Sequence, residues 1–440
     1  MRFDYFFRRA KESGIEDAEV FVTSSTSLSF SLFHSEIDQF SMNDSVSVLA
    51  RGMVNGKFGA ASCDVWNKEK ADYLIAEILR NSAVIENDDP QFIFEGSPRY
   101  RKAGLDSTGL ANVSIEEKKA KLFALEAAIR DYDERISEVE SVSYREVSSS
   151  TTLVNSKGLR LTQKGGYYYY YGSAVAKSGQ QVKTGGELFL DNDFSKFNPA
   201  ELAKQVAENA LSKLGGEACE SKTYTAVLSP EVVSMLLSSY IQSADAEEIQ
   251  KKSSLFMGKL DDKVASSKVT VEDRPLEKTV FARSFDDEGV ATFNKPIIRA
   301  GKLKTYLYNL TTAHKDGTVS TGNASRGLGK IGVEPVCLFM KPGKLTQEEL
   351  FQKVGTGVYI TEITGLHAGM NRQSGNFSLQ SGGFLIKDGK KDRPLDMITV
   401  SGNLMKLFMD IREVGSDVRL FPSAVSCPSV IVKRLKVAGK

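Results

Sequence analysis

Apolar and polar residues alternate along much of the first part of the chain, between residues 17 and 64. The apolar side of this pattern is formed by Leu28, Phe30, Leu32 and His34, with Ser27, Ser29, Ser31 and Phe33 between them. A period of two is typical of a strand with one buried face, so we expect His34 to pack in the core beside its apolar neighbours. The pair Asn55-Gly56 interrupts the pattern and predicts a two-residue hairpin turn.

Five stretches are expected to be helices. They span residues 4–14, 67–83, 114–132, 199–213 and 230–243. Ser114 is followed three residues later by Glu117, which gives the third stretch a capping-box start. Further strands are expected at 137–190 and 222–228, and Asp388-Gly389 predicts a second hairpin. Antiparallel strands combined with a few helices predict an α+β fold.

The length of 440 residues is too great for one compact core and favours two domains. A polar stretch that begins at Gly215-Gly216 is the candidate boundary. We therefore predict an N-terminal α+β domain over 1–214 and a β-rich C-terminal domain over 220–440, each with an antiparallel or mixed sheet and a few helices. Residues 86–112 are polar, contain Pro and Gly, and are expected to form a long surface loop.

Charge and composition exclude several classes of function. The 57 basic and 56 acidic side chains leave a net charge of +1 without long basic runs, so nucleic acid is not an expected partner. The sequence also lacks the ~18-residue apolar run that would span a bilayer, and its N-terminus lacks an apolar signal region. We therefore expect a cytoplasmic protein that does not bind membranes. Free, buried thiols are expected at Cys63, Cys219, Cys337 and Cys427, which form no CxxC pair.

A run of five tyrosines, Tyr167 to Tyr171, lies within an expected strand, so rings must lie on both of its faces. One face is expected in the core and the other at an interface. The alternative is an aromatic platform that contacts a peptide.

The histidines limit the metal chemistry that the chain can perform. Zinc hydrolases commonly use two histidines on one helix, whereas the three histidines of this chain lie far apart in the sequence. His314 is expected at the surface or as a helix cap, and His367 lies in the Gly-rich segment TGLHAGMNRQSGNFS, which suits a backbone-lined groove. The adjacent acids Asp286, Asp287 and Glu288 are expected to be solvated at a turn, because consecutive residues cannot all point inward from a strand.

Several segments of the second half carry a resemblance to a known family. They are FDDEGVATFNKPIIRAGKLKTYLYN (285–309), STGNASR (320–326), GVYITEITG (357–365), SGNFSLQSGGFLIKDGK (374–390), ITVSGNL (398–404) and CPSVIVKRLKVAG (427–439). With these segments the chain resembles the TldD/PmbA family, specifically its PmbA (TldE) branch. The first half agrees with the family in pattern only.

This resemblance implies a TldD–TldE heterodimeric zinc metallopeptidase that acts on peptides or unfolded segments. In such a pair the TldD-type subunit carries HExxxH on a helix and a cysteine ligand near its C-terminus. The corresponding helix here is 230–248, where Leu237 and Gln242 replace the histidines and Ser238 replaces the glutamate. Leucine cannot bind zinc and serine is no general base at neutral pH, and Cys427 does not match the cysteine ligand. We therefore expect no catalytic residue and no metal in this chain, and zinc in a TldD-like partner.

The main hypothesis is a non-catalytic subunit that pairs with a TldD-like paralogous subunit through its β-rich C-terminal domain. Segments within 357–386 are expected to receive an extended peptide substrate by main-chain hydrogen bonding. The candidate peptide contacts are Thr321, Asn323, His367, Asn371 and Ser374. The alternative role for these residues is to hold turns and the subunit interface.

Two other functions stay open. One is a free-standing peptide-binding or regulatory homodimer, in keeping with the family's older name, modulator of DNA gyrase. The other is a hydrolase with a Ser or Cys nucleophile and His367 as its base.

Overall fold

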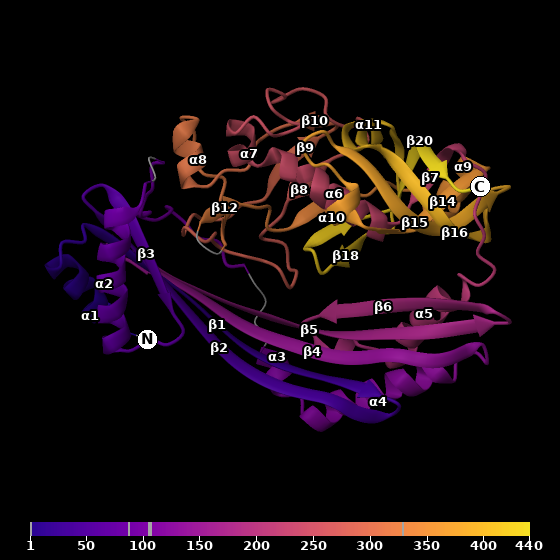
Figure 1. Ribbon diagram of the computed structural model, residues 1–440, viewed down its shortest axis with the longest axis horizontal. Coiled ribbons are helices and arrows are strands. Elements are labelled where there is room, and N and C mark those ends of the chain that lie inside the picture. Colours follow the sequence, from indigo (N-terminus) through magenta and orange to yellow (C-terminus); the bar gives the residue numbers. More distant parts are fainter. Residues whose placement is uncertain (1, 87–88, 104–107, 328–329) are drawn as a thin grey trace.

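The computed structural model describes residues 2–86, 89–103, 108–327 and 330–440. It consists of a long, curved sheet and a C-terminal body, residues 222–440, that lies against one face of this sheet (Figure 1). The sheet has the strand order β3-β2-β1-β4-β5-β6 and is antiparallel throughout. Its strands are β1 (Asp17–Phe33), β2 (Glu36–Val54), β3 (Lys57–Cys63), β4 (Ile136–Asn155), β5 (Arg160–Ser178) and β6 (Gln181–Asp191). Alternate residues are buried where helices cover the sheet, as at Leu28, Phe30 and Leu32 of β1, whereas residues 36–47 of β2 are exposed or half-buried.

Helices cover the sheet on the face away from the C-terminal body (Figure 1). They are α1 (Asp4–Glu12), α2 (Lys68–Val84), α3 (Thr108–Ala111), α4 (Ile115–Arg130) and α5 (Pro199–Leu211), with a 3-10 turn η1 (Phe194–Lys196) before α5. The side chain of Ser114 accepts a hydrogen bond from Glu117 N, so the predicted start of α4 is confirmed. Gly59 on β3 packs so closely against α2 that a Cβ atom would lie 1.9 Å from Ile78 O.

The C-terminal body is built from two six-stranded sheets and a two-stranded one. The first sheet, in the order β16-β15-β14-β7-β20-β17, closes on itself because β16 also pairs with β20. Its strands are β7 (Lys222–Leu228), β14 (Gly357–Thr364), β15 (Asn376–Lys387), β16 (Lys390–Asn403), β17 (Ile411–Val414) and β20 (Val430–Ala438). The second, in the order β10-β9-β8-β13-β19-β18, contains β8 (Val271–Asp273), β9 (Lys295–Arg299), β10 (Lys302–Leu303), β13 (Leu338–Met340), β18 (Arg419–Phe421) and β19 (Val425–Cys427).

Short helices surround these sheets, and the small sheet pairs β11 (Ala324–Arg326) with β12 (Ile331–Val333). The helices are α6 (Pro230–Ile241), α7 (Ala246–Gln250), α8 (Leu310–Lys315), α9 (Gln347–Val354), α10 (Leu366–Gly369) and α11 (Leu404–Met409), with a 3-10 turn η2 (Gln242–Ala244) after α6. Long helices and sheets that mix parallel with antiparallel pairing confirm the predicted α+β fold. The division into 1–214 and 220–440 stays a prediction.

The tyrosine run lies across the middle of the long sheet. Tyr168 and Tyr170 are fully buried beneath the helices, where Tyr170 stacks on Phe197 with 3.8 Å between ring centroids. On the opposite face, the half-buried ring of Tyr167 lies 6.4 Å from that of Phe281 in the C-terminal body. One face of the run is therefore in the core and the other meets the second half of the chain.

Both predicted hairpins are present, and a third turn shows why the expectation for His34 was wrong. Asn55 and Asp388 have φ of 49°, and each is followed by a glycine with positive φ, as a two-residue turn requires. His34 also has a φ of 49° because β1 already ends at Phe33 and the chain turns back at His34-Ser35. The His34 side chain is exposed rather than packed in the core.

The predicted surface loop over 86–112 connects the two halves of the molecule rather than lying free on the surface. Tyr100 Oη donates a hydrogen bond of 2.7 Å to Gly289 O in the C-terminal body. Residues 87–88 and 104–107 of this expected loop lie outside the described residues. Within the described ranges, no helix is both long and apolar enough to cross a membrane.

Candidate functional site

Helix α6 runs through the C-terminal body and forms one wall of a cleft. Its N-terminus is fixed by Ser229, whose Oγ accepts a hydrogen bond from Val232 N, and by Pro230 in the first turn. Apolar residues recur at helical spacing along α6 and form a buried stripe of Val232, Val233, Leu236, Leu237, Tyr240 and Ile241. Tyr240 stacks on Phe408 with 4.4 Å between ring centroids. Tyr240 Oη also donates to Val264 O at 2.5 Å, so the helix is held in place on its buried side by both packing and a hydrogen bond.

A cavity of about 530 Å³ opens beside the C-terminal end of α6, and we call it the α6 cleft. Its lining comes from α6, η2, α7, β12, β13 and the loops between elements of the C-terminal body. The polar lining residues are Ser238, Ser239, Gln242, Ser243, Asp245, Glu248, Ser253, Ser254, Glu334, Arg372 and Ser423. The apolar ones are Ile241, Leu307, Val333, Pro335, Leu338 and Ala424. This volume lies within the range of about 300–1,000 Å³ that is typical of small-molecule sites, although the lining is more polar than in most of them.

The cleft is predominantly acidic. Asp245, Glu248 and Glu334 line it together with one guanidinium, that of Arg372, which is exposed and forms no ion pair within the described ranges. Burial raises the pKa of Asp245 from 3.8 to about 6. A hydrogen bond from Glu247 N to this carboxylate opposes the rise. Such a lining suits a cationic group more than an anionic one.

The residues that stand in place of the zinc motif are divided between the core and the cleft. Leu237 is fully buried in the hydrophobic core, whereas Ser238 and Gln242 line the α6 cleft. The lining contains no imidazole and no thiolate, and the described ranges contain no group of three or more His, Cys, Asp or Glu side chains placed to hold a metal ion. The donor set of this cleft therefore does not fit catalytic zinc.

Cys427 lies at the opposite end of α6 from the cleft. Its side chain is fully buried, and Sγ donates a hydrogen bond of 3.2 Å to Pro230 O. Burial raises the pKa of the thiol, so it is a core group rather than a thiolate ligand. All four cysteines are free; three are buried as expected, and Cys63 is half-buried.

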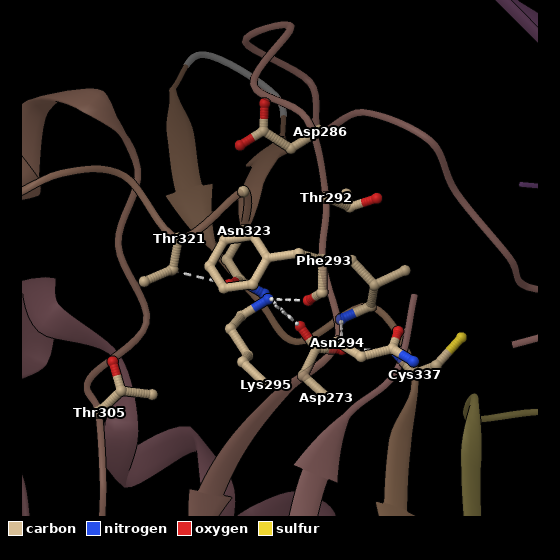
Figure 2. Close-up of polar contacts among 12 residues, drawn as sticks. Asp273, Asp286, Thr292, Phe293, Asn294, Lys295, Thr305, Thr321, Asn323 and Cys337 are labelled. Atoms are coloured by element: carbon tan, nitrogen blue, oxygen red, sulfur yellow. Dashed lines mark hydrogen bonds and ion pairs between the residues drawn. The ribbon is translucent and has the colours of Figure 1, made fainter. Parts of the chain in front are cut away.

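Two of the five predicted peptide contacts belong to a buried polar network (Figure 2). Thr321 Oγ1 donates to Asn323 Oδ1 at 2.8 Å, and Asn323 Nδ2 donates to Asp273 Oδ2 at 2.8 Å. Lys295 Nζ lies 2.9 Å from the same carboxylate oxygen. Both peptide candidates are nearly inaccessible to solvent, with 8% of Thr321 and 1% of Asn323 exposed. This bonding favours their alternative role, which is to hold turns.

The network nevertheless shapes the α6 cleft. Asn323 Nδ2 donates to Glu334 O at 2.9 Å, and Glu334 N donates back to Asn323 O at 2.9 Å. Glu334 lines the cleft, so Asn323 acts on the site through the backbone that it holds.

The other three predicted contacts lie together on the surface segment that enters the cleft at Arg372. Asn371 Oδ1 accepts a hydrogen bond from Ser374 N at 2.9 Å, and both side chains are exposed. His367 is exposed on α10, a few residues before them. Within the described residues the His367 side chain forms no hydrogen bond with a serine or cysteine. Its surroundings therefore do not support a hydrolase with a Ser or Cys nucleophile and His367 as its base. Direct peptide binding by these residues stays a prediction.

Two expectations from the sequence were wrong in this part of the chain. The acids Asp286, Asp287 and Glu288 are buried rather than solvated, because each carboxylate accepts hydrogen bonds from backbone N–H groups. The donors to Asp286 are Glu288, Val290 and Ala324, the donor to Asp287 is Arg326, and the donor to Glu288 is Leu310.

Strands β14 and β15 also offer little free edge to an extended peptide, since β14 lies between β7 and β15, and β15 lies between β14 and β16. The exposed position of His314 in the last turn of α8 confirms its expected surface role.

Sequence reasoning missed the charged groups of the cleft. Asp245 and Glu248 directly follow the predicted helix in the segment ADAEE, which was a usable signal. Arg372 lies beside Asn371 in the Gly-rich segment that was recognised as a groove. Glu334 gave no signal, because only the pairing with Asn323 brings it to the cleft.

Comparisons with known proteins agree with this architecture. The PmbA/TldA metallopeptidase C-terminal domain matches residues 221–439, and the central domain of the same family matches residues 109–214. The chain therefore belongs to the PmbA/TldD family. A PmbA homolog of Buchnera aphidicola that is named a metalloprotease is 30% identical over 244 residues. This alignment covers 55% of the chain and spans about half, 52%, of the relative.

Solved structures of similar proteins cover 99% of the chain. A Thermotoga maritima protein, described as a candidate modulator of a DNA gyrase, is 31% identical with a TM-score of 0.92 and 99% coverage of both chains. TldE from Thermococcus kodakarensis gives a TM-score of 0.91 with 99% coverage of this chain and 100% of its own. Its identity is only 21%, so this second likeness concerns the fold alone.

Proposed function

We propose that this chain is the non-catalytic subunit of a two-subunit zinc metallopeptidase that processes peptides or unfolded segments. The observation that carries the proposal is the α6 cleft, which has the volume of a substrate site but no imidazole or thiolate in its lining and no described cluster of side chains placed to hold a metal ion. A TldD-like paralogous subunit would supply the zinc and the general base. The metalloprotease name of the Buchnera relative supports a peptidase role for such a complex.

The α6 cleft is the proposed site for one stretch of the peptide substrate. Its three carboxyl groups outnumber the guanidinium of Arg372, so a stretch with a lysine or a free amino group is the preferred occupant. Peptide held here would continue toward the exposed side chains of His367, Asn371 and Ser374. Thr321 and Asn323 act indirectly, because their polar groups are already bonded within the chain.

A fluorescently labelled, unstructured peptide that contains lysine tests this part of the proposal by anisotropy. Arg372→Glu makes the cleft more acidic, so we expect about ten-fold tighter binding, equivalent to about 1.4 kcal/mol. Ser423→Trp fills the cleft and is expected to abolish binding. Lys390→Glu makes the same charge change on an exposed turn away from the cleft, and it should leave the affinity unchanged. Equal affinities for all four proteins would place the peptide elsewhere.

The loop that follows the cleft is the proposed contact with the TldD-like subunit. It leaves Ser253 and Ser254 at the cleft and then exposes Met257 and Leu260, each with 49% of its surface accessible. Exposed apolar side chains beside a cleft are typical of a surface that another subunit covers. The neighbouring position would let a partner close over peptide held in the cleft.

Analytical ultracentrifugation of the chain mixed with its TldD-like paralogue tests this contact. The unaltered chain is expected to form a complex, and the double variant Met257→Lys/Leu260→Lys is expected to prevent it, because two lysines would be buried without partners. Val84→Lys changes an apolar residue on α2 that is 75% exposed, and it should leave the complex intact. A complex that forms equally with the double variant would contradict the proposed interface.

A free-standing peptide-binding or regulatory homodimer is the second candidate. It is favoured by whole-chain similarity to the Thermotoga protein that is described as a candidate modulator of a DNA gyrase. The same sedimentation experiment separates the two functions. A homodimer that ignores the paralogue supports the second candidate, whereas exchange into a mixed complex supports the first.

A further inference from the structure

A second cavity, of about 250 Å³, lies between the long sheet and the C-terminal body, away from the α6 cleft. Its apolar lining comes from the N-terminal half and consists of Leu49, Phe58, Ala60 and Ile85, with Arg51 of β2 beside them. The opposite wall is polar and comes from α7, α8, β11 and β12. Two halves of the chain that are distant in sequence therefore enclose one amphipathic space, which we call the inter-half cavity.

Two buried arginines reach the inter-half cavity from opposite halves. Arg51 on β2 donates Nε to Glu19 Oε1 at 3.0 Å and Nη2 to Phe92 O at 2.9 Å. Arg326 on β11 donates Nε to Asp287 O at 2.7 Å and Nη2 to the same oxygen of Glu19. The Nη1 group of each arginine donates to nothing in the described ranges of the chain. Each buried guanidinium thus keeps one unused donor group beside a shared cavity.

The two arginines share a single carboxylate. Glu19 lies between the two guanidiniums and forms an ion pair with each. Asp287 also accepts a hydrogen bond from Arg326 N at 2.8 Å, but its carboxylate forms an ion pair with Arg283. Glu288 lines the cavity and accepts a hydrogen bond from Leu310 N at 2.8 Å. Two guanidiniums with one shared ion-pair partner therefore lie beside the cavity.

The charged groups on the rim of the cavity are paired with one another. Lys315 lies 2.5 Å from Asp89, and both Lys330, at 2.8 Å, and Lys251, at 2.6 Å, lie beside Glu247. The acids of the rim are therefore engaged by lysines, and the arginine side of the cavity determines its preference. An Arg pair with free donors is the arrangement that proteins commonly use to hold a carboxylate.

We propose that the inter-half cavity binds a small organic carboxylate with an apolar body. The carboxylate accepts hydrogen bonds from Nη1 of Arg51 and of Arg326. The apolar body packs on Leu49, Phe58 and Ala60. A free apolar amino acid and the C-terminal residue of a peptide both present this chemistry, and the site does not depend on the function proposed for the α6 cleft.

Isothermal titration calorimetry with 3-phenylpropionate tests the site, with 3-phenyl-1-propanol as the uncharged control. We expect the carboxylate to bind at least about ten-fold more tightly than the alcohol, since a charge-assisted bidentate contact is lost with the alcohol. Arg51→Lys keeps the charge beside Glu19 but loses the forked donor geometry, so it should weaken binding by a similar factor. Failure of the carboxylate to bind, or equal binding of the alcohol, would overturn the proposal.

A variant that leaves the buried charges untouched guards against misfolding. Ala60→Leu adds bulk to the apolar wall and is expected to block the ligand. Ser62→Leu, two residues further along the same face of β3, is exposed and outside the cavity, and it should bind like the unaltered chain. Unchanged binding by Ala60→Leu would place the ligand elsewhere and overturn the proposal.

The source of the natural ligand follows from two further titrations. Stronger binding of L-phenylalanine than of N-acetyl-L-phenylalanine identifies a free amino acid, whereas the reverse order identifies the C-terminus of a peptide. Both results support the site. If neither compound binds and 3-phenylpropionate does not bind either, the cavity is not a carboxylate site and the proposal is overturned.

Discussion

Lys295 supplies the counter-charge of the buried Asp273 carboxylate, and its replacement by methionine would isolate that charge (Figure 2). None of the Asp273 side chain and only 5% of the Lys295 side chain is accessible to solvent. Methionine has a similar length and an apolar surface, so the substitution removes the charge without opening a large cavity. The perturbation therefore measures one buried ion pair.

The remaining contacts of Asp273 determine the size of the effect. Removing one partner of a buried pair costs about 3–5 kcal/mol, because the other charge stays in the interior without compensation. Asp273 keeps three N–H donors, from Asn323 at 2.8 Å, Cys337 at 2.9 Å and Val336 at 3.0 Å. Since these donors still stabilise the carboxylate, we expect a loss at the lower end of the range, about 3 kcal/mol.

Urea unfolding followed by circular dichroism would give the loss of stability for Lys295→Met. Hydrogen exchange of the segment around Val336 and Cys337 would show whether the loss is local to the network, because these amides donate to Asp273. Lys302→Met changes an exposed lysine on β10 and should stay within about 0.5 kcal/mol of the unaltered chain. A loss below about 1 kcal/mol for Lys295→Met, the value typical of an exposed pair, would show that Lys295 does not compensate a buried charge on Asp273.

Three further predictions concern other parts of the chain. Gly59→Ala should destabilise the N-terminal half by about 3 kcal/mol or more in thermal unfolding, because the new Cβ would overlap Ile78 O. Gly165→Ala is the control and should be nearly neutral, because a Cβ at this position has no atom within 4 Å. Ser114→Ala removes the cap of α4, and urea unfolding should show a loss of about 1 kcal/mol. The pKa of Asp245 is higher in the folded chain, about 6, than its ordinary 3.8, so this group lowers stability as pH rises between these values. Asp245→Asn should therefore become more stable relative to the unaltered chain from pH 4 to pH 7, and a constant difference would contradict the assigned cause.

Local sequence signals were sufficient for the long helices and for the first strands, but not for the short helices α3 and α7 to α11. The alternation over 17–64, the cap at Ser114 and the turn at Asn55-Gly56 each depend on neighbouring residues, and each lies where the pattern predicts. His34 differs because its position is equally compatible with a strand and with a turn. Only the pairing of Phe33 with Glu36 decides between them.

Contacts between distant residues were not predictable from one sequence. Asp286 is buried because Ala324 N, 38 positions further on, donates to it. Glu334 reaches the α6 cleft through Asn323, and the inter-half cavity requires Arg51 and Arg326 to share Glu19. Each of these arrangements depends on long-range pairing, which residue patterns do not encode.

Zinc content and peptidase activity of the purified chain, alone and after mixing with its TldD-like paralogue, distinguish a non-catalytic subunit from a peptidase. For the chain alone we expect neither stoichiometric zinc nor cleavage, because its α6 cleft has no imidazole or thiolate donor. Activity should appear or rise in the mixture. Stoichiometric zinc together with cleavage by this chain alone would show that it has a zinc site of its own.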